Sequence, residues 1–171
     1  MLKLMGIMGL ILSFGLYGIS KTSRLKERVM LLEDYYEMVI ALKGQKNYFK
    51  EPLPDIFKKT SKNSHSKAHL FLKALGDDID KKGCYTRDFW SNNLIYIYKD
   101  TPLTTEDIET MSYLGEFIGQ TDYDNHLQHF SYMQEKLKKQ IDKSKTIFNQ
   151  KGPMYSKIGF FIGAIAGILL L

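Results

Sequence analysis

The chain ends in IGFFIGAIAGILLL, residues 158–171, an apolar run that leaves no polar face on a helix. A helix that is apolar all round needs an apolar surround, either a protein core or a membrane. These 14 residues would cover about 21 Å, less than a hydrocarbon core of about 30 Å. Met154, Tyr155 and a snorkelling Lys157 would lengthen the run enough for a thinned bilayer. The sequence therefore predicts a C-terminal transmembrane helix over residues 154–171.

A second uncharged run, LMGIMGLILSFGLYGIS, occupies residues 4–20 between Lys3 and Lys21. As a helix it would cover about 26 Å, so snorkelling by the two lysines could complete a span. We expect an N-terminal transmembrane helix over residues 1–21. A secretory signal peptide has a similar layout, and that alternative requires cleavage near Ser20 and an exported domain.

Basic residues gather on the inner side of both apolar runs. Such clusters stay in the cytoplasm and are attracted to anionic lipid headgroups. We therefore expect a cytoplasmic middle region and anionic lipids as partners. The basic residues assigned to the membrane surface are Lys21, Arg24, Lys26, Arg28, Lys151 and Lys157.

Three glycines of the last run are spaced by four residues. Gly159, Gly163 and Gly167 therefore share one helix face and form a doubled GxxxG pattern, which allows close helix packing. The partner would be the first apolar run, through Gly9 and Ser13, or another protein. Glycine is also simply common in membrane helices, which is the alternative without specific packing.

The middle region, residues 22–153, predicts an all-α domain. Its first helix has apolar residues in a 4-3-4-3 spacing typical of one helix face, and it would continue straight out of the first membrane segment. That face consists of Leu25, Val29, Leu32, Tyr36 and Val39.

Turn and capping residues then divide the middle region. A left-handed cap is expected at Gly44, Gly83 is expected to end a helix, and Thr104 with Asp107 has near-capping-box spacing. The run Leu94–Tyr98 is the best strand candidate, but it has no plausible partner strand. Further boundaries are expected at Pro52, Ser64 or Ser66, Thr86, Pro102, Gly119, Thr121 or Asp122, and Gly152–Pro153. The resulting prediction is a bundle of about six helices, flanked by the two transmembrane helices.

The chemistry-bearing residues do not form a recognisable catalytic or metal site. Cys84 is the single cysteine, which excludes an internal disulfide framework and a cysteine-rich zinc module. His65 and His69 have helical spacing but no adjacent glutamate, and zinc sites need at least three protein ligands. His126 and His129, with Asp122 and Asp124 upstream, are more typical of a helix start with a solvated face than of a metal site. No phosphate-binding glycine motif is present, and the net charge of +5 is explained by the membrane-proximal lysines rather than by nucleic-acid binding. We therefore expect no enzyme activity, metal or cofactor.

The layout and several short motifs resemble the stage III sporulation protein AB family. The main match is Leu114–Asp122, LGEFIGQTD, followed by Gln128-His129; Pro52-Leu53 and Trp90 also fit. The family is itself similar to the cytoplasmic domain of the type II secretion F protein, an inner-membrane platform.

The resemblance implies a scaffold role in the machinery that joins mother cell and forespore. It implies location in the mother-cell-derived membrane around the forespore. It also implies two kinds of partner: the sporulation ATPase, stage III sporulation protein AA, and other membrane proteins of the same complex. The alternative function is a membrane-anchored binder or enzyme that acts at anionic lipid headgroups.

The GE…G…D…H motif has two interpretations. Under the first, Gly119 ends one helix, Asp122 caps the next, and Gly115 allows close packing. Under the second, Glu116, Asp122 and His129 form part of a surface that docks a partner. The candidate docking or helix-junction set is therefore Gly115, Glu116, Gly119, Asp122 and His129.

Overall fold

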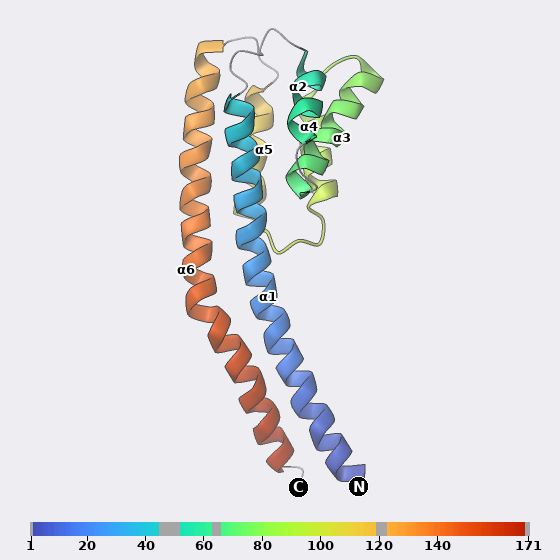
Figure 1. Ribbon diagram of the computed structural model, residues 1–171, viewed down its shortest axis with the longest axis vertical. Helices are drawn as coiled ribbons and strands as arrows, with labels where there is room; N and C mark the ends of the chain where they lie inside the picture. The colour runs from blue at the N-terminus through green and yellow to red at the C-terminus, as the bar shows by residue number, and fades with distance from the viewer. Residues whose placement is uncertain (1, 45–51, 63–65, 119–122, 170–171) are drawn as a thin grey trace. The chain divides into compact units, whose positions relative to one another are not determined.

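The computed structural model describes residues 2–44, 52–62, 66–118 and 123–169, without the side chains of residues 2–5, 10 and 123–127. Those residues form helices and short connections, and no strand occurs among them. The helices are α1 (Leu2–Gly44), α2 (Leu53–Ser61), α3 (Lys67–Lys82), α4 (Arg87–Ile97), α5 (Thr105–Phe117) and α6 (Tyr123–Leu169) (Figure 1). The predicted all-α class with about six helices is confirmed.

The chain divides into two compact units. The first, here called the terminal unit, consists of residues 1–29 and 142–171; the second, the helical domain, consists of residues 30–141. Both α1 and α6 contribute to each unit. The prediction that the first helix continues from the N-terminal apolar run is confirmed.

Local capping explains several helix boundaries. The Ser66 hydroxyl accepts a hydrogen bond from the His69 backbone N–H at 3.4 Å, at the start of α3. Gly83 ends α3 with a φ of 73°, the left-handed conformation that glycine adopts without strain. Thr104 and Asp107 form a complete capping box at the start of α5. These three predictions are correct.

Three other boundary predictions differ from the structure. Gly44 is the last residue of α1 but has no left-handed conformation, because a helical glycine costs only about 1 kcal/mol. Pro153 lies inside α6 rather than ending it; the ring removes one hydrogen bond, and packing on α1 holds the helix on both sides of it. Residues 94–97 of the strand candidate belong to α4.

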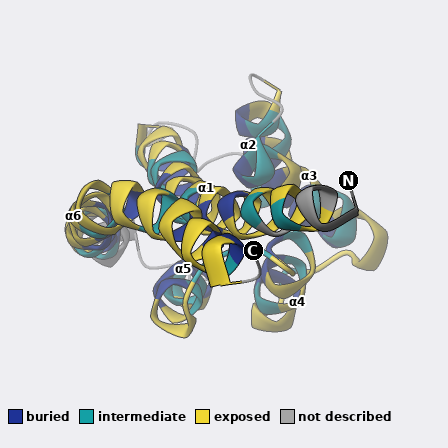
Figure 2. Cartoon of the chain, turned by 90° about the horizontal axis from the view of Figure 1, so that it is seen from below, coloured by how far each residue is buried: buried dark blue, intermediate teal, exposed yellow. Residues whose placement is uncertain are grey.

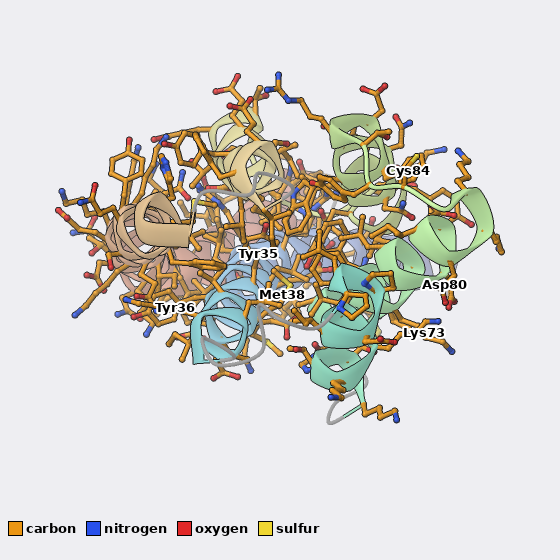
Figure 3. All side chains as sticks on the ribbon, turned by 90° about the horizontal axis from the view of Figure 1, so that it is seen from above. Tyr35, Tyr36, Met38, Lys73, Asp80 and Cys84 are labelled. Carbon is orange, nitrogen blue, oxygen red and sulfur yellow. The ribbon has the colours of Figure 1, made fainter. Side chains whose placement is uncertain are left out.

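Aromatic side chains form the centre of the helical domain. Trp90, Tyr35, Phe57 and Phe71 are all fully buried. The Phe71 and Trp90 rings meet edge to face with centroids 4.8 Å apart, a favoured aromatic geometry. Figure 3 shows Tyr35, together with Met38, among the side chains that α1 contributes to this core.

Buried polar groups in the domain join helices that are distant in sequence. The Met111 carbonyl oxygen on α5 accepts hydrogen bonds from the Tyr35 hydroxyl at 2.7 Å and the Trp90 indole N–H at 3.0 Å. The Gln140 amide on α6 donates to the Thr110 hydroxyl at 2.9 Å. Because unpaired buried polar groups are costly, these bonds hold α1, α4 and α6 in register with α5.

Candidate functional site

Close contact between α1 and α6 defines the terminal unit, where the two segments run antiparallel with both chain ends at the same end of the unit (Figure 1). The three glycines of the GxxxG pattern face α1, and a Cβ on any of them would collide with it. The clashing atoms would be the Phe14 carbonyl oxygen at 2.5 Å from Gly159, the Ile11 Cα at 2.9 Å from Gly163, and the Ile7 side chain at 2.8 Å from Gly167.

The face that α1 presents differs from the predicted one. Gly18 approaches α6 so closely that a Cβ would lie 2.5 Å from the Tyr155 carbonyl oxygen. Gly9 has no such neighbour within 4 Å, and Ser13 is exposed. The expectation that Gly9 and Ser13 form the contact is therefore wrong. Gly9 lies about 200° around the helix from Ile7, which is on the contacting face.

Small polar groups join the two helices near Pro153. The Thr22 Oγ1 atom lies 2.8 Å from the Gly152 carbonyl oxygen, 3.1 Å from the Gly18 carbonyl oxygen and 3.0 Å from the Ser156 hydroxyl oxygen. One hydroxyl has a single proton to donate, so Ser156 serves as the donor to Thr22 when Thr22 donates to a carbonyl. The cluster ties α1 to α6 through backbone atoms on both helices.

The outward surface of the two apolar runs in the terminal unit consists largely of apolar side chains. Figure 2, viewed from the chain-end side, shows many exposed residues on these segments of α1 and α6. The large exposed apolar residues include Met8, Leu12, Leu16, Phe161, Ile165 and Ile168. Among the residues described, only the helix segment Gln128–Leu169 meets the length and composition of a membrane span.

The basic residues assigned to the membrane surface lie on exposed or half-exposed positions. Lys21, Arg24 and Lys26 are exposed on α1, and Arg28 is half-buried. On α6, Lys151 and Lys157 are exposed, the latter beside the apolar run. The Lys21 ammonium lies 5.4 Å from the centre of the exposed Tyr17 ring. An aromatic ring beside a cation is typical of a membrane–water interface.

A second candidate site lies near the end of α5 in the helical domain. Gly115 is buried against the Trp90 indole, and a Cβ would lie 2.2 Å from the Trp90 Cγ. The Tyr85 hydroxyl donates to the Gly115 carbonyl oxygen at 2.6 Å. Burial raises the pKa of Tyr85 above its ordinary value of 10.0, which keeps this phenol a donor near neutral pH.

Charged and aromatic residues surround the same end of α5. Glu116 lies 4.0 Å from the Arg87 guanidinium, and both side chains are well exposed. The His129 ring on α6 stacks on Phe117 with centroids 3.6 Å apart and accepts or donates a 3.2 Å hydrogen bond with the Tyr113 hydroxyl. Gly119 and Asp122 lie outside the described residues. The structure therefore brings the end of α5, where Glu116 lies, close to His129 near the start of α6.

Other chemistry-bearing residues remain separate. No group of three potential metal ligands occurs within residues 2–44, 52–62, 66–118 and 123–169. His69 bonds Ser66 at 2.7 Å, and Cys84 is exposed. His65 and the His126 side chain are not described. Sequence reasoning missed Thr22 and Tyr85. It expected close packing at Gly115, which the structure confirms, but it did not identify Trp90 as the neighbour.

Comparisons with known proteins point to one family. The family model described as "Stage III sporulation protein AB" matches residues 3–171. A solved structure titled "Stage III sporulation protein AB (SpoIIIAB)" is similar to this chain, with a TM-score of 0.64 and 17% sequence identity; the match covers 71% of this chain and 96% of that one. At this identity, the likeness shows a shared fold. No match was found among curated proteins.

Proposed function

The chain belongs to the stage III sporulation protein AB family, and from this premise we propose that it is a non-enzymatic scaffold of a secretion-like complex that joins mother cell and forespore. The observation that carries the proposal is the family match, which extends through both the terminal unit and the helical domain. The family is a sporulation component, so a role in sporulation is the part that follows directly.

The terminal unit would be the membrane anchor of this scaffold. An apolar exterior on two helices that touch through glycines is expected when lipid, rather than protein, surrounds the pair. The uncharged run at residues 4–20 supports entry of α1 beside the α6 span. Lys21, Lys151 and Lys157 would then lie at the headgroups, with the domain on the cytoplasmic side of the mother-cell-derived membrane around the forespore.

The end of α5 would be the partner-docking surface. Glu116 and His129 are charged or polar residues near adjoining ends of α5 and α6. The close contact of Gly115 with Trp90 holds this end of α5 against the core. Such groups change orientation little when a rigid core holds their helices, which favours specific recognition. The proposed partners are the ATPase, stage III sporulation protein AA, and other membrane proteins of the same complex.

A pull-down from sporulating cells tests the proposal. The full-length chain would be captured in mild detergent, and bound proteins would be identified by mass spectrometry. We expect the ATPase and membrane proteins of the complex to be enriched, and Glu116→Lys to reduce that enrichment. The matched control is Glu109→Lys, which makes the same charge change at another exposed position of α5.

Two results would separate the parts of the proposal. If Glu116→Lys leaves the enrichment unchanged, the proposed docking surface is contradicted but the scaffold function is still supported. No enrichment with an intact, folded bait would overturn the scaffold and favour a membrane-anchored binder or enzyme acting at anionic lipid headgroups.

A further inference from the structure

A cleft in the helical domain lies between α2 and α3, away from the proposed docking residues at the end of α5. The two helices pack closely at Gly76, where a Cβ would lie 3.1 Å from the Lys58 side chain and 3.3 Å from the Pro54 carbonyl oxygen. Beside this contact the cleft has a volume of about 390 Å³, within the range of small-molecule sites. Its walls are Lys58, Ser61 and Lys62 on one side, and His69, Leu70, Lys73 and Asp77 on the other.

Cations outnumber carboxylates in the cleft. The Lys58 ammonium forms an ion pair with the Asp80 carboxylate and also lies 4.0 Å from the Asp77 carboxylate. Lys62 and Lys73 form no ion pair within the described part of the chain. Figure 3 shows Lys73 and Asp80 on α3. Among the described residues, the two lysines therefore provide ammonium groups in the cleft that are not held in an ion pair.

His69 adds one N–H donor to the cleft. The Ser66 hydroxyl accepts from the His69 backbone N–H and lies 2.7 Å from the His69 Nδ1. In the tautomer in which this hydroxyl donates to Nδ1, the proton of neutral imidazole is on Nε2. The Ser61 hydroxyl gives its only proton to the Lys58 carbonyl oxygen at 2.9 Å and is not a donor for an anion. The donors for an anion are therefore the lysine ammonium groups and His69.

The types of side chain favour a phosphoryl group. Lysine ammonium groups are compact point charges that bind phosphate, and the cleft wall has three lysines and no arginine. Leu70 is 50% exposed at this wall, so an organic part of the ligand would have apolar surface to cover. We propose that this cleft binds a phosphate ester, with its phosphoryl group held by Lys62 and Lys73.

Binding of glycerol 3-phosphate to the full-length chain tests the proposal. The chain would be held in nanodiscs of phosphatidylcholine, which carry no net charge, and titrated by calorimetry. We expect saturable binding that Lys62→Glu and Lys73→Glu each weaken by at least about tenfold, the effect of losing a charge-assisted hydrogen bond. Lys81→Glu is the matched control, since Lys81 is exposed on α3 outside the cleft.

Further arms distinguish the source of the phosphoryl group. If it belongs to a lipid, nanodiscs with phosphatidylglycerol should suppress binding of glycerol 3-phosphate by the unaltered chain, and by the Lys81→Glu control to the same extent. If it belongs to a soluble ester, the anionic nanodiscs should have no such effect. Inorganic phosphate should bind more weakly than the ester, because it has no organic part to cover Leu70.

Two outcomes would overturn the proposal. The first is no saturable binding of glycerol 3-phosphate by a chain whose circular dichroism and thermal unfolding match the folded state. The second is equal weakening by Lys81→Glu and the cleft variants, which would indicate a general charge effect. Neither outcome bears on the scaffold function, which depends on α5 and the terminal unit.

Discussion

The Trp90 indole occupies the space where Gly115 would otherwise carry a side chain, with only 2.2 Å between the Trp90 Cγ and an ideal Cβ on Gly115. The indole N–H meanwhile donates to the carbonyl oxygen of Met111, one turn earlier on α5. Trp90 therefore fixes both the distance and the axial position of α5 against α4. Glu116, the next residue after Gly115, takes its position from this contact.

Gly115→Ala should lower the free energy of unfolding by about 1–3 kcal/mol, the range for overpacking a dense core. The helix-propensity gain of alanine, about 1 kcal/mol, offsets part of that loss. Gly44→Ala is the control, because Gly44 is also helical but has nothing within 4 Å of its Cβ position. Urea unfolding in detergent should show a lower free energy of unfolding for Gly115→Ala and a higher one for Gly44→Ala, each relative to the unaltered chain. A loss of stability in both would contradict the role of Trp90.

Alkaline pH should destabilise the helical domain through its buried tyrosines. Burial, reinforced by Tyr98 and Tyr85, raises the pKa of Tyr35 well above its ordinary value of 10.0. Below pH 10 the folded and the unfolded chain both keep the Tyr35 proton, so the stabilisation linked to this phenol is fully present. As pH rises above 10, the unfolded chain loses the proton first, so stability falls.

The urea midpoint measured from pH 8 to pH 11 should therefore decrease, and Tyr35→Phe should make the decrease shallower. At pH 8 the variant should also lose about 1 kcal/mol with its hydrogen bond to Met111. Tyr96→Phe, which removes an exposed phenol on α4, is the control. If the urea midpoint of Tyr35→Phe falls with pH as steeply as that of the unaltered chain, Tyr35 is not the source of the pH dependence.

Two local capping signals in the helical domain were sufficient to place helix ends. Gly83 and the Thr104–Asp107 pair act on their own helix ends, and both were correctly assigned. Tyr35 lay outside the expected 4-3-4-3 face, although it is fully buried. Its partner Met111 is 76 residues away, so no spacing within α1 could reveal that contact.

The terminal unit also has contacts that local sequence signals do not reveal. Pro153 and Gly152 are strong local break signals, yet α6 continues because α1 contacts it at Thr22. The spacing of Gly159, Gly163 and Gly167 defines a face from the sequence alone, but the facing residues on α1 depend on how the helices rotate. The docking residues Gly119 and Asp122 remain predictions from the sequence.

Thr22→Val should lower the free energy of unfolding by about 1 kcal/mol, the usual value of a lost hydrogen bond. Thermal unfolding of the chain in nanodiscs measures this change. The variant keeps the shape of the side chain but removes the donor to the Gly152 carbonyl oxygen. Thr146→Val is the matched control, because the Thr146 hydroxyl bonds only within α6, to the Asp142 carbonyl oxygen. Equal effects of the two changes would argue against a link between the helices.

Gly159→Val should separate α1 from α6, because even a Cβ would lie 2.5 Å from the Phe14 carbonyl oxygen. Cross-linking measures this directly. In a Cys84→Ser background, Thr22→Cys with Ser156→Cys replaces two hydroxyls whose oxygens are 3.0 Å apart, and an oxidant should join them. Gly159→Val should reduce the cross-linked fraction, whereas Phe161→Val, at an exposed position, should not. Full cross-linking with Gly159→Val would show that the contact is dispensable.

The single cysteine offers a test of topology without any added reporter. Cys84 is exposed in the helical domain, so a maleimide can reach it whenever the reagent is on the same side of the membrane. If the basic residues keep this domain in the cytoplasm, a membrane-impermeant maleimide should label Cys84 only after permeabilisation. As the opposite control, Leu2→Cys with Cys84→Ser should be labelled in intact non-sporulating cells that carry the chain in their outer cell membrane, because the N-terminus would lie across that membrane. Labelling of Cys84 in intact cells, with a chain shortened by cleavage near Ser20, would instead support the signal-peptide alternative.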